Sequence, residues 1–312
     1  MKKGVLLYHK ADAVYNKGFI NMLIEKGRHH ALDLQLHLME EIRDEKGLET
    51  LLTEKNIDFA LNRTRIPEVS AFFERKDIWV CNSSKACRLG NDKAVFYQKF
   101  KEWDASIPMA ETMTFSAEEL KSVLYAPEYE SIRKKLPVLK SVQGHGGEQV
   151  FLLETPNGCR EHFRMNGHDK QKEDFGAKQY YKQLEKAIAG DVFILQEFLP
   201  IGDMARDVRV YILGNKIYAA VLRQGKEDFR ANYSLGGSAE LFTLPEETVE
   251  LVNRILTFCP LEYGGIDFIL DKNDRWILNE IEDMAGARML YQISDMDIAE
   301  DLVCYLSGED FD

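Results

Sequence analysis

The sequence is short of basic residues and has no long apolar run, and each shortage excludes a class of protein. Its 40 lysines and arginines stand against 52 aspartates and glutamates, so the formal net charge is −12. A general nucleic-acid-binding protein needs a basic surface, and we therefore expect no nucleic-acid partner. No apolar run approaches the roughly 18 residues that span a bilayer, so we expect no membrane attachment. The first apolar run is followed at once by charge and predicts a strand, not a signal peptide.

Cysteines are also few, and familiar nucleotide-binding motifs are missing. The five cysteines are odd in number and show no CxxC spacing. They are Cys81, Cys87, Cys159, Cys259 and Cys304. This pattern favours free thiols in a reducing, cytoplasmic location over a disulfide framework or a zinc site. No GxGxxG follows the first strand pattern, which argues against a dinucleotide site there.

The 312 residues, 45% of them hydrophobic, are enough for a core shared by two or three domains. From residue 1 to about 90, strand and helix patterns alternate, which predicts a small parallel α/β layer. The strand patterns are Gly4–Tyr8, Leu32–Leu38, Ile57–Leu61 and Ile78–Cys81, and the helix patterns are Ala13–Lys26, Leu48–Lys55 and Pro67–Arg75.

Two further regions follow, at 91–190 and 191–312. In the first, helices are expected at Asn91–Trp103 and Gln179–Ile188, strands at Met113–Phe115, Val138–Ser141 and Val150–Leu153, and a surface loop at Pro156–Gly176. In the second, strands are expected at Val192–Phe198, Asp207–Leu213, Lys216–Arg223, Ile266–Leu270 and Trp276–Ile281, and helices at Thr248–Phe258 and Asp297–Leu306. The chain therefore divides into predicted domains at 1–90, 91–190 and 191–312.

Three carboxylates in the last hairpin predict a metal site. If Asp267 lies opposite Leu278, then Glu280 and Glu282 share a face with Asp267. The opposite, apolar face would then hold Ile266, Phe268, Leu270, Ile277 and Ile281. Asn279 also falls on that apolar face, without an explanation. Crowded carboxylates suit Mg²⁺, which keeps water and phosphate oxygens as its other ligands, although a solvated acidic strand gives the same pattern.

A second candidate motif is KSVQGHGG, from Lys140 to Gly147. The lysine ends an apolar strand, and the glycines that follow allow backbone N–H groups to approach phosphate oxygens. The GK[ST] ending of a Walker A loop is missing, and a simple hairpin loop is the alternative. The strand end at Gln196–Leu199 offers backbone groups and an aromatic ring to an adenine, or is an ordinary core strand.

Arginines supply the remaining candidates. Asp207 and Arg209 lie on one face of a predicted strand, and Arg223 ends the next one. Guanidinium groups in a cleft can stabilise a transferring phosphoryl group or a substrate carboxylate, whereas salt bridges across a sheet are the alternative. An irregular segment, Gly225–Asn232, follows.

The order of these motifs resembles the ATP-grasp superfamily, and within it the RimK-like ligases, relatives of glutathione synthetases and lysine-biosynthesis ligases. The similarity covers essentially the whole chain. It is densest from Cys81 to Lys93 and from Lys140 to Gly286. The resemblance implies a mixed α/β (α+β) fold with an N-terminal Rossmann-like pre-ATP-grasp domain, a small central lid domain and a C-terminal antiparallel-sheet domain.

The resemblance also implies roles for individual residues. Those that match the family's ATP-binding positions are Lys93, Lys140, Gln143, Gly144, Gly146, Gly147, Glu197, Phe198, Asp207, Arg230 and Asn232. Arg209 matches a catalytic arginine beside the transferred phosphate, and Asp267, Glu280 and Glu282 match the metal ligands. Arg63, Arg223 and Arg288 are weaker candidates for binding substrate carboxylates.

The sequence departs from the family's motifs at two places, and each limits which family properties can be expected of this chain. The family's third metal ligand is usually asparagine, and here it is Glu282. The usual SSPG that follows is DMAG in this chain. This loop lies near the acceptor site in the family, so the resemblance does not identify the substrates.

The resemblance implies an ATP-dependent carboxylate–amine ligase that forms an amide through an acyl phosphate. It would use ATP and Mg²⁺, with two ions expected and Mn²⁺ as a substitute. The partner would be a small molecule, amino acid or peptide, and a homo-oligomer is a reasonable expectation. A small-molecule kinase and a nucleotide-binding regulatory protein without turnover are the alternatives.

Overall fold

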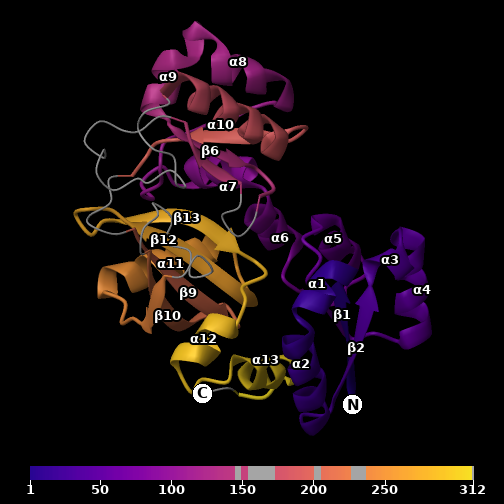
Figure 1. Cartoon of the computed structure of the whole chain (residues 1–312). Helices are drawn as coiled ribbons and strands as arrows, with labels where there is room; N and C mark the ends of the chain where they lie inside the picture. The colour runs from indigo at the N-terminus through magenta and orange to yellow at the C-terminus, as the bar shows by residue number, and fades with distance from the viewer. Residues whose placement is uncertain (145–148, 154–172, 200–204, 226–236, 311–312) are drawn as a thin grey trace.

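The computed structural model describes residues 1–144, 149–153, 173–199, 205–225 and 237–310, with the side chains of 173–179 excepted. Three sheets organise this part of the chain (Figure 1). Together they form the mixed α/β architecture expected of an ATP-grasp fold. No helix in the described residues is both long and apolar enough to cross a membrane.

The N-terminal sheet is parallel, as the alternating pattern predicts. Its strands, in the order β2-β1-β3-β4, are β1 (Lys2–Tyr8), β2 (Leu32–Leu38), β3 (Phe59–Asn62) and β4 (Trp79–Cys81). Its helices are α1 (Lys10–Tyr15), α2 (Lys17–His29), α3 (Met39–Ile42), α4 (Glu45–Lys55) and α5 (Pro67–Arg75). The single helix expected over Ala13–Lys26 is divided at Asn16, which forms the boundary between α1 and α2.

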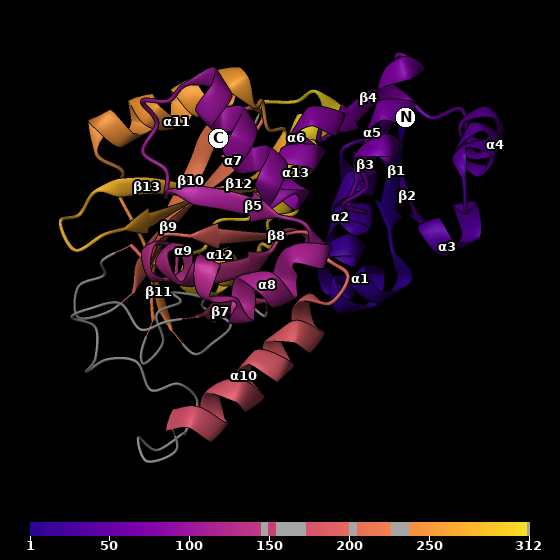
Figure 2. The ribbon, with the colours of Figure 1, turned by 90° about the horizontal axis from the view of Figure 1, so that it is seen from above.

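The central sheet is antiparallel, with the order β5-β8-β6-β7. Its strands are β5 (Thr112–Phe115), β6 (Val138–Ser141), β7 (Val150–Leu152) and β8 (Phe193–Gln196). Three helices cover one face of it, namely α8 (Leu120–Tyr125), α9 (Glu130–Lys135) and α10 (Glu173–Ile188) (Figure 2). Two 3₁₀ turns, η1 (Ala117–Glu119) and η2 (Pro127–Tyr129), flank α8.

Two expectations about this central region need correction or completion. The helix α10 begins at Glu173, so the end of the predicted loop Pro156–Gly176 is helical, whereas residues 156–172 lie outside the described residues. The predicted helix at Asn91–Trp103 corresponds to α7 (Lys93–Trp103), which Asp92 caps by accepting from the Val95 N–H, and a separate helix, α6 (Ser84–Asn91), precedes it. The domain boundaries stay predictions, although β8, which follows residue 190, pairs within the central sheet.

The C-terminal sheet is antiparallel, with the order β11-β10-β9-β12-β13. Its strands are β9 (Arg206–Leu213), β10 (Lys216–Gln224), β11 (Ser238–Leu241), β12 (Tyr263–Leu270) and β13 (Trp276–Glu282). The remaining helices are α11 (Glu246–Phe258), α12 (Arg288–Ile293) and α13 (Ile298–Ser307). The sequence patterns do not indicate the short helices α3, α6, α8, α9 and α12 or the strand β11.

The two faces of strand β9 show how the C-terminal sheet positions the site. Val208, Val210 and Ile212 point into a core that α7 and α11 complete. On the other face, Tyr211 and Leu213 join a core with α2, α12 and α13, and Figure 1 shows α13 beside α2. The same face carries charged residues nearer the start of the strand, so one sheet face is apolar at one end and polar at the other.

The predicted register of the β12–β13 hairpin is wrong. Asp267 pairs with Glu280, and Phe268 pairs with Leu278, so Asn279 is an extra residue in a β-bulge. The bulge reverses which face the residues before it occupy. Leu278 therefore lies in the apolar core, and Ile277 lies on the face of the carboxylates, each opposite to the expectation. Glu280 and Glu282, which follow the bulge, still share a face with Asp267.

Candidate active site

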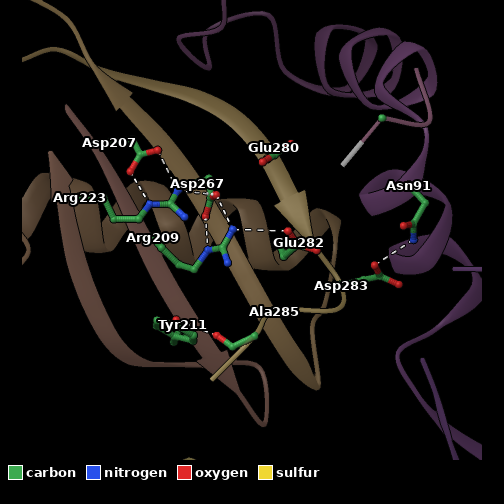
Figure 3. Close-up of polar contacts among 12 residues, drawn as sticks. Asn91, Asp207, Arg209, Tyr211, Arg223, Asp267, Glu280, Glu282, Asp283 and Ala285 are labelled. Atoms are coloured by element: carbon green, nitrogen blue, oxygen red, sulfur yellow. Dashed lines mark hydrogen bonds and ion pairs between the residues drawn. The ribbon is translucent and has the colours of Figure 1, made fainter. Parts of the chain in front are cut away.

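Three strands of the C-terminal sheet bring four charged side chains to one face. Arg209 on β9 pairs directly with Asp267 on β12, and Asp207 on β9 pairs with Arg223 on β10. Because directly paired residues point to the same side of a sheet, these four side chains converge (Figure 3). The expectation that Asp207 and Arg209 share a face is therefore correct.

These residues form a continuous ion-pair array. Arg209 donates from Nε to Asp267 Oδ1 at 2.8 Å and from Nη2 to Asp267 Oδ2 at 2.7 Å. Arg223 donates from Nη2 to the same Oδ2 at 2.8 Å, and its Nε and Nη2 donate to Asp207 at 2.5 and 2.9 Å. Arg209 also reaches Glu282 Oε2 at 3.4 Å. Two guanidinium groups thus serve three carboxylates.

Because the array is buried, the pKa of each carboxyl group in it depends strongly on the charged groups beside it. Asp267 is 1% exposed and Arg223 6% exposed. Burial disfavours the charged form of Asp267, but Arg209 and Arg223 outweigh it and hold the pKa of this carboxyl well below its usual range. Burial raises the pKa of Asp207, and its pairing with Arg223 limits the rise. Asp267 is therefore the carboxylate that stays ionised.

Two lysines from the central region face the other end of the carboxylate row. Lys93 Nζ lies 3.9 Å from Glu280 Oε2 and donates to the Gly144 carbonyl at 2.5 Å. Lys140 Nζ donates to Asn279 Oδ1 at 3.2 Å. Burial lowers the pKa of Lys140 to about 8, although the charge of Glu280 opposes that shift. The structure thus brings both predicted lysines to the β12–β13 hairpin, which carries the three predicted metal ligands.

Asn279 gains the explanation that the sequence lacks. As the bulged residue it belongs to neither regular face, and its side chain meets Lys140 while its carbonyl accepts from the Tyr97 hydroxyl at 3.0 Å. A polar residue on an otherwise apolar strand face is the sequence signal that could have indicated the bulge.

Asp283 is a second residue that sequence reasoning missed. Its side chain is 1% exposed, and Oδ1 accepts from Asn91 Nδ2 at 2.9 Å (Figure 3). Burial raises the pKa of Asp283 to about 7, and the charge of Glu282 adds to the shift. The sequence gives no periodic signal for either Asp283 or Asn91, because both lie at the ends of elements.

The predicted nucleotide contacts are only partly within the described residues. Glu197 accepts from the Glu111 N–H at 3.0 Å and donates its own N–H to the Glu111 carbonyl at 2.9 Å. Gly144 and Gln143 stand at the end of the described β6 loop, and Phe198 directly follows Glu197. Gly146, Gly147, Arg230 and Asn232 lie outside the described residues.

The three arginines proposed for substrate carboxylates occupy very different places. Arg223 lies in the buried array. Arg63 is buried too, and donates to the carbonyls of Asp283 and Ala285. Arg288 is exposed, with its guanidinium 4.0 Å from the ring centre of Tyr15.

The donor chemistry of the carboxylate row fits Mg²⁺. Asp267, Glu280 and Glu282 share one sheet face and offer only hard oxygen atoms. Both oxygens of Asp267 already accept hydrogen bonds, but each carboxylate oxygen has two acceptor positions, so ligation remains open to it. The side chains of Glu280 and Glu282 are 34% and 28% exposed, which leaves their oxygens accessible.

The three sheets and their topology are those of an ATP-grasp fold. The model of the RimK-like ATP-grasp domain matches residues 113–306, and the chain belongs to that family. ATP binding is a property of the family.

Individual relatives extend this comparison. The chain is 26% identical over 291 residues to the uncharacterized protein MG011 homolog of Mycoplasma pneumoniae, covering 93% of this chain and 86% of that protein. It is 26% identical over 241 residues to a probable alpha-L-glutamate ligase of Histophilus somni, covering 76% and 70%. Its fold is similar to that of the ATP-grasp ligase PsnB solved with a minimal precursor, Mg and ADP. The TM-score is 0.57 and the identity 15%, over 98% of this chain and 96% of PsnB.

Proposed function

We propose that the protein is an ATP-dependent carboxylate–amine ligase that forms an amide bond through an acyl phosphate. One observation carries the proposal most strongly. Lys93 and Lys140 from the central region converge on the same hairpin that presents Asp267, Glu280 and Glu282 beside Arg209. Cations on one side and hard carboxylates on the other are what a triphosphate with its metal requires.

The proposed roles follow from these positions. Lys93 and Lys140 bind the α- and β-phosphates, and Arg209 stabilises charge on the phosphoryl group in transfer. Asp267, Glu280 and Glu282 would hold Mg²⁺, with two ions proposed and Mn²⁺ able to substitute. When bound, the metal neutralises charge that develops on the phosphate oxygens.

The reaction has two balanced steps. A substrate carboxylate oxygen attacks the γ-phosphorus of ATP, the bond from that phosphorus to the bridging oxygen breaks, and ADP leaves. The amine nitrogen then attacks the acyl carbon, the bond to phosphate breaks, and the amine releases a proton. Water must be kept out because an acyl phosphate hydrolyses, and we assign this task to the central region as a lid.

The nucleotide base is assigned to the strand end at Glu197 and Phe198, with Asp207 as a further nucleotide contact. Gln143, Gly144, Gly146 and Gly147 would cover the phosphates, and Arg230 and Asn232 would add contacts. The division into domains at 1–90, 91–190 and 191–312 belongs to the same proposal.

The substrates are proposed only as a chemical class. We propose that an amino acid is added to a small molecule, peptide or protein, and the probable alpha-L-glutamate ligases among the relatives make glutamate the first candidate. Of the three arginines, Arg288 is the one whose guanidinium is exposed and forms no ion pair with a described residue, so it is best suited to a substrate carboxylate. A homodimer and a cytoplasmic location complete the proposal.

A coupled assay for ADP and phosphate, run over amino acids and small peptides, tests this function. A ligase releases both products only when a carboxylate and an amine are present. Adding hydroxylamine in place of the amine should trap the acyl phosphate as a hydroxamate. ADP release with a stable phosphorylated product and no free phosphate would indicate a kinase instead, and nucleotide binding without turnover on any substrate would indicate a regulatory protein.

A further inference from the structure

The segment that follows the proposed metal ligand Glu282 is fixed by side chains from elsewhere. Residues 283–286 are in neither helix nor strand. The Asp283 carbonyl accepts from Arg63 Nη1 at 3.3 Å and from Asn82 Nδ2 at 3.0 Å. Because an irregular segment cannot satisfy its own carbonyls, such donors determine where it lies.

The next carbonyls are held in the same way. Ala285 accepts from Arg63 Nη2 at 3.3 Å and from the Tyr263 hydroxyl at 3.0 Å, and Gly286 accepts from the Tyr211 hydroxyl at 3.0 Å. Arg63 is the side chain that joins two of these carbonyls, two residues apart. Its planar fork suits this task, because a lysine ammonium is a point donor on a flexible stem.

Arg63 is a buried cation. It is 6% exposed, it forms no ion pair with a carboxylate in the described chain, and its Nε has no hydrogen-bond partner there. Its guanidinium lies 5.2 Å from the centre of the Tyr263 ring, which offsets part of the cost of burying the charge. Burial disfavours the charged form of Arg63, but Tyr8, Tyr263 and Asp283 outweigh it and hold the pKa of Arg63 above its usual value. The surroundings therefore suit a guanidinium that donates to the segment's carbonyls.

The position of this segment bears directly on Glu282. The Glu282 residue ends β13, where it pairs with Gly265, and the segment begins at the next residue. The contact is tight: a Cβ on Gly264 would lie 2.8 Å from the Glu282 carbonyl oxygen. Glu282 is thus fixed by β12 on one side and by the segment held by Arg63 on the other.

We propose that Arg63 is a positioning residue for the metal site, which it reaches from the N-terminal sheet through the carbonyls of Asp283 and Ala285. This proposal rests on Glu282 being a metal ligand, as assigned above. Arg63 does not touch substrate in this role. It orients Glu282 through the backbone, and loss of such outer contacts weakens metal sites in general. Arg63 follows β3, so the N-terminal sheet and the metal site are then parts of one unit.

Direct metal binding tests the proposal without relying on turnover. Mn²⁺ is titrated into the protein with a non-hydrolysable ATP analogue, and free Mn²⁺ is measured by electron paramagnetic resonance. We expect Arg63→Ala to weaken Mn²⁺ binding by about 10–100-fold, the usual effect of losing an outer contact to a metal ligand. Guanidinium chloride at low millimolar concentration should restore binding to this variant, because the free cation can donate to the same two carbonyls.

Arg65→Ala is the matched control. Arg65 lies two residues away and pairs with Asp12 at 2.7 Å. It forms no hydrogen bond with the segment 283–286 within the described residues, so this variant should bind Mn²⁺ as the wild type does. If Arg63→Ala melts at lower temperature but binds Mn²⁺ normally, Arg63 is only structural and the proposal is overturned.

Arg63→Lys keeps the test decisive if the alanine variant does not fold. It retains the charge but not the fork, so we expect weakened Mn²⁺ binding that guanidinium does not restore. Wild-type binding by Arg63→Lys would overturn the proposal. Failure of the wild-type protein itself to bind Mn²⁺ with the nucleotide would instead overturn the proposed metal site, a result distinct from the failure of the role of Arg63.

Discussion

Arg209 and Asp267 meet as a two-pronged pair on neighbouring strands, with Nε–Oδ1 and Nη2–Oδ2 distances of 2.8 and 2.7 Å. They are also directly paired in the β9–β12 ladder, so backbone and side chains fix the same contact. The side chains are 12% and 2% exposed, which makes the contact much less subject to solvent screening than a surface pair. In the proposed reaction, this guanidinium is held in place before a phosphoryl group arrives.

Replacing Arg209 by methionine should therefore lower turnover strongly. A preorganised cation that stabilises developing charge contributes about a hundredfold or more to turnover, and methionine removes it while keeping a similar length. ATP-dependent ADP formation by the purified variant measures the effect.

Arg206→Met is the control for that experiment. Arg206 lies on the same strand and pairs with Asp274, whose side chain is 71% exposed, so its loss should change turnover by less than about twofold. Equal losses in the two variants would show that the strand is disturbed in general, and normal turnover in Arg209→Met would remove Arg209 from the proposed mechanism.

The acidic hairpin gives a prediction that separates its two glutamates. Glu280→Gln should lower turnover by at least about a hundredfold, as should Lys140→Ala, because each removes an electrostatic contact to the metal or nucleotide. Glu282→Asn should remain active and need only a moderately higher Mg²⁺ concentration, since an amide oxygen is still a hard ligand. A Mg²⁺ titration of ADP formation checks this order, and a Glu282→Asn variant as inactive as Glu280→Gln would contradict it.

The hairpin also shows how far sequence reasoning reaches. The identity of the three carboxylates and their common face follow from alternation, and the structure has them so. The register does not, because a single bulged residue, Asn279, shifts every pairing before it and exchanges Ile277 with Leu278. Alternation assumes one residue opposite one residue, so it cannot place an inserted residue, and the polar Asn279 on the apolar face was its one local signal.

The remaining omissions have a tertiary origin. Asn82 and Tyr211 donate to backbone carbonyls, and Asn91 donates to the Asp283 carboxylate, in a segment more than 70 residues away in the chain. Neither periodicity nor composition records such a contact. The parallel N-terminal sheet and the long helices were predictable because hydrophobic spacing alone decides them.

Lys140 provides a prediction about stability. Its pKa of about 8 lies below the value of about 10.4 for an exposed lysine, so the folded protein releases a proton that the unfolded chain keeps between these pH values. Stability therefore increases as pH rises from 8 to 10, and below pH 8 the full cost of the buried ammonium is present. Lys140→Met should raise the free energy of unfolding at pH 7 by about 1–2 kcal/mol, after loss of the hydrogen bond to Asn279.

Urea denaturation of the metal-free protein at pH 7 and pH 10 checks this expectation. The advantage of Lys140→Met should shrink at pH 10, while the variant stays inactive at both values. Lys99→Met, at a half-exposed lysine paired with Glu102, should show no such pH dependence. If Lys140→Met is less stable than the wild type at pH 7, the buried ammonium of Lys140 does not destabilise the folded protein.

His30 joins two glutamates near the C-terminal helix. Its Nε2 lies 2.7 Å from Glu300 and its Nδ1 2.8 Å from Glu309, which are hydrogen-bond distances. Cys304 Sγ is 3.8 and 3.9 Å from the two ring nitrogens, so His30, Glu300 and Cys304 also lie close enough together to share a metal ion. We interpret the cluster as a protonated histidine between two acids, because Lys26 Nζ, 2.9 Å from Glu300, shows that cations already neutralise this carboxylate.

The hydrogen bonds that His30 donates, first to Glu300 and then to Glu309, raise the pKa of His30. The stability it contributes is therefore fully present below the unfolded pKa of about 6.5 and is lost as pH rises through the folded pKa. His30→Gln should lower the free energy of unfolding at pH 6 by about 1 kcal/mol or less, because both glutamates are partly exposed, and should have little effect at pH 9. His29→Gln, at the exposed neighbour, should change neither value. Equal destabilisation of His30→Gln at both pH values would refute the ion pairs of a protonated His30 with Glu300 and Glu309. A rise in melting temperature with added Zn²⁺ that depends on His30 would show a metal site instead.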